Sequence, residues 1–266
     1  SGTRQVWRMA ADGSGRAQIT SLPVDVGFYR LSADGRVLVV GLDVYPDCAD
    51  LACTRARAEA AEKVKASGKS FADGVIPRTF DHYEDELFTG LYSVRLDGVG
   101  APAEATPLTP GLKTDADGDQ LAISRDGKLV WFAATPAGVS SGTGAIASLY
   151  TVPGDGSAAP ARLAPAGAAS DSRPVLSPDG KTLAYVAEVA PVMIAQRSAL
   201  MIRDLKTGAT REVAPDLDIS ANALAWSPDG KALYVTSQSM GQVKLFAVNI
   251  ADGKVATVVG DGTVAA

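Results

Sequence analysis

One short sequence motif occurs four times along this 266-residue chain and constrains its fold more than any other feature. Each copy reads Ser-x-Asp-Gly followed by a basic residue, at 32–36, 124–128, 177–181 and 227–231. Asp and Gly are expected to supply the two positive-φ positions of a tight hairpin turn, and the runs after each copy are β-branched or aromatic enough for buried strands. We therefore expect each copy to join the two inner strands of one sheet.

The spacing of the copies indicates a repeat architecture. The last two intervals are about 53 and 50 residues, the length of a four-stranded propeller blade. Two more strand signals follow within a unit, for example 199–203 and 210–213. The first interval is about 92 residues, because residues from about 46 to 80 do not read as strand. The sequence predicts an all-β chain, a β-propeller of four-stranded blades with one helical insertion at about 46–80.

The number of strands indicates that the propeller is partial. The segments 5–9 and 17–20, joined by a turn at Asp12-Gly13, read as the two outer strands of a blade whose inner pair is missing. Residues 1–266 then form a partial propeller domain of about four and a half blades. We expect propeller sequence to be missing upstream and downstream, and the open blade edges would allow self-association.

Composition excludes several classes of partner. The formal net charge is −5 and no Lys/Arg cluster stands out, which argues against nucleic acid. No run of about eighteen apolar residues exists, so no membrane span is expected. No glycine-rich phosphate loop or nucleotide motif is evident, and no cofactor is expected.

The chain has two cysteines, Cys48 and Cys53, both in the inserted segment. No other cysteine or nearby histidine completes a zinc site. A local disulfide at the base of the insertion would imply an oxidising compartment such as the periplasm. The alternative is a pair of free, buried thiols.

The insertion also contains a predicted helix over 51–66, rich in Ala, Arg, Glu and Lys. Glu59 and Lys63 are placed for an ion pair four residues apart, and Gly68 would end the helix as a cap. The helix has few large apolar residues, so its buried face should be thin. It is either a solvated helix lying over a blade or a cover over the propeller face.

At this point the sequence resembles a known family. The string 43–54 contains both cysteines, precedes the Ala/Lys-rich helix, and is followed by Thr79-Phe80-Asp81-His82-Tyr83. This looks like the propeller insertion of bacterial secreted prolyl oligopeptidase-family serine peptidases, in the branch of dipeptidyl aminopeptidases and acylaminoacyl peptidases. The segment 19–27 and the Ser-Pro-Asp-Gly repeats fit the same group, and the resemblance covers essentially the whole chain. One departure is Phe80-Asp81-His82-Tyr83, where relatives commonly carry Trp-Asp-Thr-Trp.

The resemblance implies an α/β-hydrolase domain after the propeller, with the propeller capping its active-site cavity. That catalytic domain is absent from this chain, which is therefore expected to be non-catalytic. Ser140 sits in a Gly-x-Ser-x-Gly match, but another strand and no helix follows it, so it does not read as a nucleophile elbow. His82 is the only histidine and reads as a surface or packing residue.

The string Tyr83-Glu84-Asp85-Glu86 is a candidate substrate-binding site. Dipeptidyl peptidases of this superfamily anchor the free α-amino group of the substrate with propeller carboxylates, because a desolvated ammonium requires a charged partner. The resemblance would give this role to Glu84 or Glu86, beside Tyr83. The alternative is a solvated acidic loop.

A second acidic string, Asp115-Ala116-Asp117-Gly118-Asp119, suggests calcium binding. The glycine lies one place before the third aspartate, and no bidentate glutamate follows at the twelfth position of the loop. We therefore interpret the string as an acidic turn and expect no metal.

Two functions fit these observations. The first is the substrate-gating propeller of a periplasmic or secreted serine exopeptidase, which admits short peptides to an enclosed cavity. The second is a stand-alone periplasmic propeller that holds protein partners, as translocation-associated envelope propellers with similar repeats do. The cysteine-containing insertion favours the first.

Overall fold

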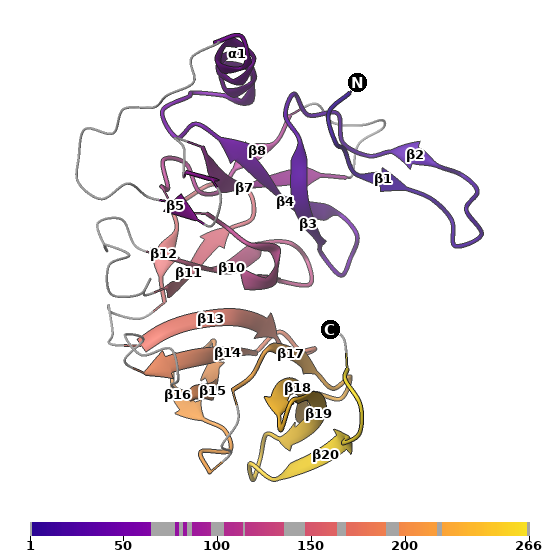
Figure 1. Cartoon of the computed structure of the whole chain (residues 1–266), viewed down its shortest axis with the longest axis vertical. Coiled ribbons are helices and arrows are strands. Elements are labelled where there is room, and N and C mark those ends of the chain that lie inside the picture. Colours follow the sequence, from indigo (N-terminus) through magenta and orange to yellow (C-terminus); the bar gives the residue numbers. More distant parts are fainter. Residues whose placement is uncertain are drawn as a thin grey trace.

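A computed structural model shows four antiparallel sheets arranged in sequence order along an arc (Figure 1). The structure describes residues 2–64, 78–79, 82–83, 87–96, 104–113, 115–135, 147–163, 169–189, 197–216 and 220–264. An N-terminal hairpin and the fourth sheet lie at the two ends of this arc.

Each of the four sheets has four strands, and in each the strand order follows the sequence. The first sheet contains β3 (Val26–Leu31), β4 (Val37–Val44), β7 (Phe88–Arg95) and β8 (Thr106–Pro107). The second contains β9 (Leu121–Ile123), β10 (Leu129–Ala134), β11 (Ser148–Pro153) and β12 (Ala161–Arg162). The third contains β13 (Ala169–Leu176), β14 (Thr182–Val189), β15 (Ser198–Asp204) and β16 (Thr210–Glu212). The fourth contains β17 (Ala223–Trp226), β18 (Ala232–Ser239), β19 (Gln242–Asn249) and β20 (Val255–Val259).

The N-terminal hairpin consists of β1 (Trp7–Arg8) and β2 (Ala17–Gln18), which pair only with each other among the described residues. Four complete sheets and one two-stranded hairpin are the predicted four and a half blades. The architecture expected from the repeats is therefore confirmed.

The four copies of the motif lie between the first and second strands of the four sheets, and hydrogen bonds from their polar side chains stabilise the turns. In each copy the serine hydroxyl donates to the aspartate at 2.6–2.9 Å. The same hydroxyl accepts from the backbone N–H five residues later at 2.9 Å. Only the glycine has positive φ, between 69° and 73°. The expectation that both Asp and Gly occupy positive φ is therefore wrong, because the aspartate acts through its side chain.

The core is divided among the interfaces between neighbouring sheets. Along β10, Val130 and Phe132 face the first sheet, whereas Trp131 and Ala133 face the third. Strand side chains alternate between the two faces, so a strand covered on both sides is apolar at successive positions. This explains why the runs after the repeats are continuous apolar stretches.

The connection between β4 and β7 contains the single α-helix of the described residues, α1 (Leu51–Glu62), and a small hairpin of β5 (Arg78–Thr79) and β6 (His82–Tyr83). The helical insertion is therefore confirmed. The helix ends at Glu62 with Lys63 as its C-cap, earlier than the predicted end at residue 66. Glu59 pairs with Arg55 at 2.6 Å and not with the expected Lys63. Gly68 lies outside the described residues.

Among the described residues, no helix combines the length and apolar character needed to cross a bilayer.

Candidate functional site

The two ends of the sheets differ, and the longer connections gather at one of them. In an antiparallel sheet whose strands follow the chain order, the first-to-second and third-to-fourth turns share one end. The second-to-third connections share the other. We call the second end the connection end. Three of its four second-to-third connections are long, at 45–87, 135–147 and 190–197, and only β18 and β19 are joined by two residues, Met240 and Gly241. Rigid strands that carry irregular connections are where binding residues usually lie.

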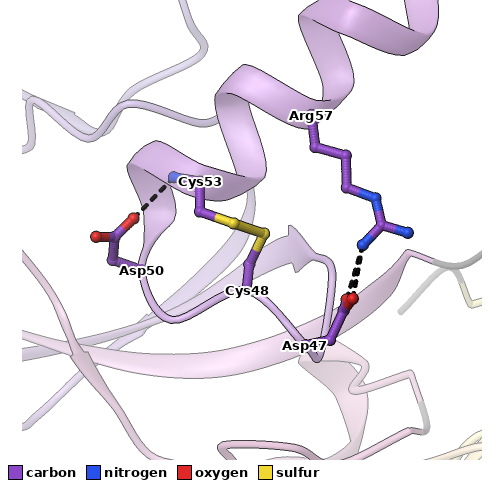
Figure 2. Close-up of a disulfide and its surroundings, with 5 residues drawn as sticks. All are labelled: Asp47, Cys48, Asp50, Cys53 and Arg57. Atoms are coloured by element: carbon purple, nitrogen blue, oxygen red, sulfur yellow. Dashed lines mark hydrogen bonds and ion pairs between the residues drawn. A yellow bond between two sulfur atoms is a disulfide. The ribbon is translucent and has the colours of Figure 1, made fainter.

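The start of α1 is fixed to the connection end by polar contacts and a disulfide (Figure 2). Cys48 and Cys53 are joined by a disulfide. Asp50 is the N-cap, and its Oδ1 accepts from the backbone N–H of Cys53 at 2.7 Å. A carboxylate at this position satisfies one of the unpaired N–H groups at a helix N-terminus.

One turn further on, a basic side chain ties α1 to the segment before it. Arg57 donates from Nη1 to both carboxylate oxygens of Asp47, at 2.8 and 2.9 Å, and lies 4.1 Å from the ring centroid of Tyr45. This bonding lowers the pKa of Asp47, with the Arg57 hydrogen bond as the largest cause.

The apolar attachment of α1 is thin, as its composition predicts. Only Leu51 and Thr54 are buried, and the Thr54 hydroxyl is without a hydrogen-bond partner in the described structure. The helix is therefore attached largely by the disulfide and by the contacts of Arg57.

The predicted substrate-binding residues are only partly described. Tyr83 and His82 form β6, with Tyr83 paired to Arg78 and His82 to Thr79. Glu84 and Glu86 lie outside the described residues, as does Ser140. Tyr83 therefore belongs to the connection end, and its pairing with two carboxylates stays a prediction.

The second acidic string has a separate partner for each aspartate. Asp115 Oδ1 accepts from the backbone N–H of Thr89 at 2.9 Å. Asp117 caps the short 3-10 helix η1 (Gly118–Gln120), and Asp119 pairs with Arg30 at 3.2 Å. In the described part of the chain, no group of three or more His, Cys, Asp or Glu side chains is placed to hold a metal ion.

The structure adds one functional candidate that sequence reasoning missed. Asp171 lies at the connection end on β13, the first strand of the third sheet, opposite Ala187. Burial raises its pKa to about 6, and no other group contributes to that shift. Burial raises the pKa of the neighbouring Tyr185 to about 12, and the charge of Asp171 adds to that effect. Among the described residues, the Asp171 carboxylate has no hydrogen-bond or ion-pair partner.

The strand that carries Asp171 is distorted immediately after it. A register shift separates Ser172 from Val175, and Arg173 has φ of 54° in the left-handed region. The Arg173 N–H donates to Gln120 Oε1 at 2.7 Å, and Trp226 Nε1 donates to the Val175 carbonyl at 3.1 Å. Bulges redirect side chains and are common beside functional sites. The segment 169–174 has no strand-like alternation in sequence, so the pattern could not place Asp171 on a strand.

These features define the chain as a β-propeller region with its longer second-to-third connections gathered at one end. No family model matches the chain. Relatives named dipeptidyl-peptidase 5 do match it. A probable form from Emericella nidulans is 29% identical over 215 residues, covering 72% of this chain and 29% of the relative. The form from Aspergillus fumigatus is 32% identical over 198 residues, covering 66% and 28%.

Solved structures similar to this chain support the same fold. A Mycobacterium tuberculosis puromycin-hydrolyzing peptidase has a TM-score of 0.56 at 18% identity, covering 97% of this chain and 35% of that one. TolB from Acinetobacter baumannii has a TM-score of 0.56 at 16% identity, covering 97% and 49%. At these identities the likeness shows the fold alone.

The resemblance stated from the sequence is therefore confirmed. The chain is similar to dipeptidyl-peptidase 5 proteins over 72% of its length, and the similar solved structures share its fold. The chain spans about 29% of the length of the curated relatives it matches.

Proposed function

We propose that this chain is the substrate-gating propeller of a secreted or periplasmic serine exopeptidase of the dipeptidyl or acylaminoacyl type. The main observation that supports this proposal is the similarity to dipeptidyl-peptidase 5 proteins across 72% of the chain. In this proposal residues 1–266 are a partial propeller domain and do not themselves catalyse. The nucleophile, histidine and acid belong to an α/β-hydrolase domain outside this chain.

The proposed mechanism is steric. The stacked sheets form a rigid wall, since each interface between them has its own buried apolar cluster. The connection end would face the hydrolase domain and admit short peptides while excluding folded proteins. Glu84 or Glu86, beside Tyr83, would anchor the substrate ammonium. The disulfide between Cys48 and Cys53 supports an oxidising compartment, since such bonds persist in the periplasm and outside the cell.

One observation favours a second candidate, a periplasmic scaffold for protein partners. TolB from Acinetobacter baumannii matches 97% of this chain with a TM-score of 0.56. Its identity of 16% is far below that of the peptidase relatives, so the gating role is the better supported proposal. In either role the acidic net charge of −5 argues against nucleic acid as a partner. Self-association through open sheet edges would compete with either role in the isolated chain.

The test of gating compares two substrates on the protein encoded by the complete gene. Both carry the same N-terminal tripeptide, one as a short peptide and the other fused to a folded domain. We expect dipeptide release from the short peptide alone. Equal release from the folded fusion would refute gating, and a gene without a downstream Gly-x-Ser-x-Gly elbow, Asp and His would favour the scaffold.

The proposed anchor has its own test in the same protein. Glu84→Gln and Glu86→Gln should each be compared on a peptide with a free N-terminus and on its acetylated form. The anchor predicts that at least one substitution raises KM for the free peptide by tenfold or more and leaves the acetylated one unchanged. Equal effects on both peptides, or none, would show a solvated loop.

A further inference from the structure

A groove of about 480 Å³ lies between the start of α1 and strands β7 and β8. One wall comes from the segment from Val44 to Ala52, which contains Cys48 of the disulfide and Asp50, the N-cap of α1. The other wall comes from β7, from β8 and from the turn after β8.

The lining of this groove has an unusual chemistry. Two tyrosines, Tyr45 and Tyr92, lie in it together with four prolines. The prolines come from separate parts of the chain, at positions 23, 46, 107 and 110. Because proline has no N–H, these walls offer flat apolar rings and few backbone donors. A ligand that fits must therefore bring apolar rings of its own and must not depend on backbone donors from the protein.

The polar groups that line the groove favour a ligand with free carbonyl groups. Tyr92 is partly buried, and burial raises its pKa, which keeps its hydroxyl protonated as a donor. Among the described residues, that hydroxyl has no hydrogen-bond partner. Thr109 already accepts at Oγ1 from the backbone N–H of Leu91 at 2.9 Å, so its own O–H is directed elsewhere. An extended polyproline-type segment has no internal hydrogen bonds, and its carbonyl groups are all available.

The charges at the groove indicate which sign of charge a ligand should carry. Of the described residues that line it, two are charged, Asp50 and Glu104, and both are acidic. Two arginines of α1 lie nearby and are not among the lining residues. Arg57 is held by Asp47 and lies over the ring of Tyr45. Arg55 donates to the Pro23 carbonyl at 3.0 Å and pairs with Glu59. A positively charged group on the ligand would therefore be attracted and a negative one repelled.

We propose that this groove binds an extended, proline-containing peptide segment that carries a lysine or arginine. Aromatic-lined grooves accept such segments because the preformed conformation of the segment loses little entropy on binding. The tyrosine rings would stack on the ligand prolines, the Tyr92 hydroxyl would donate to a ligand carbonyl, and Asp50 and Glu104 would receive the cation. The proposal does not depend on the peptidase function.

The experiment titrates the 266-residue chain with a capped five-residue peptide of four prolines and a central arginine, followed by calorimetry. Two matched peptides replace the arginine by glutamate or the prolines by glycine. We expect binding of the arginine peptide and at least tenfold weaker binding of both others. No heat up to about 1 mM of the arginine peptide, or equal binding of all three, would overturn the proposal.

Three variants locate the site. Tyr92→Phe removes one hydroxyl and keeps the ring, and should weaken binding about fivefold, as expected for one hydrogen bond. Glu104→Lys should weaken the arginine peptide and strengthen the glutamate peptide. Glu62→Lys makes the same charge change on α1 away from the groove and should change neither. If Tyr92→Phe and Glu104→Lys bind like the unsubstituted chain while their circular dichroism is unchanged, the groove is not the site.

Discussion

Replacing Asp171 by asparagine should stabilise the protein at neutral pH. The folded state raises the pKa of this carboxyl from 3.8 to about 6. At about 1.4 kcal/mol per pKa unit, the full shift corresponds to about 3 kcal/mol. The side chain is only half-buried, and solvent screening reduces this to about 1–2 kcal/mol. Asparagine keeps the size and polarity of the side chain and has no charge to desolvate.

The pH dependence follows from the sign of the shift. A carboxyl with a raised pKa in the folded state stabilises that state below the unfolded pKa of 3.8, and this contribution is lost as the pH rises through about 6. The gain in the free energy of unfolding of Asp171→Asn over the unsubstituted protein should have its full value at pH 8. It should be about half of that value at pH 5 and close to zero below pH 3.8. The turn aspartates, such as Asp126 with its pKa lowered to about 2, have the opposite trend but are common to both proteins.

The assay is urea unfolding followed by circular dichroism at pH 5 and pH 8. The exposed Asp261→Asn removes the same charge and serves as the control, for which we expect no comparable gain. A loss of stability for Asp171→Asn at pH 8, or a gain that does not change between the two pH values, would refute the reasoning. The first result would mean that the carboxylate has a partner.

The remaining predictions concern a repeated turn and the disulfide. Gly127 and Gly35 both have positive φ, but a Cβ at Gly127 would lie 2.5 Å from Val37, whereas a Cβ at Gly35 meets nothing within 4 Å. In chemical unfolding, Gly35→Ala should lower the free energy of unfolding by about 1–2 kcal/mol, and Gly127→Ala should lower it by about 1–3 kcal/mol more. Equal losses in the two variants would contradict the close packing of Gly127 against Val37. Reducing the bond between Cys48 and Cys53 should remove about 2 kcal/mol of loop-closure stabilisation and speed amide exchange in α1 but not in the sheets. Unchanged exchange in α1 would show that its other contacts suffice.

Much of the fold could be predicted from the sequence because the repeated turn is a local signal. The motif at 227–231 forms one hydrogen-bonded unit, in which Ser227 bonds to Asp229 and to Gly230. The motif therefore specifies the turn wherever it occurs. The spacing of about 50 residues between the last three copies then gives the number of strands in each sheet. The early end of α1 at Glu62 was not predicted, because the sequence continues as Lys-Val-Lys-Ala-Ser with no breaker until Gly68.

The candidate site was less accessible to sequence reasoning. Asp171 and Tyr185 come from different strands, and only the pairing of β13 with β14 brings them together. The groove likewise combines Tyr45 and Tyr92, which are 47 positions apart and separated by the insertion. A linear pattern does not show that such residues line one groove. The spacing of the two cysteines, in contrast, permitted a disulfide but left a pair of free thiols as the alternative, and the structure shows the disulfide.

The most direct test of the central claim is one activity measurement on two proteins. A dipeptidyl 4-nitroanilide should be offered to the isolated 266-residue chain and to the protein encoded by the complete gene. The account predicts release of nitroaniline by the complete protein and none by the isolated chain. Turnover by the isolated chain that disappears in Ser140→Ala would contradict it, because the chain would then contain its own nucleophile.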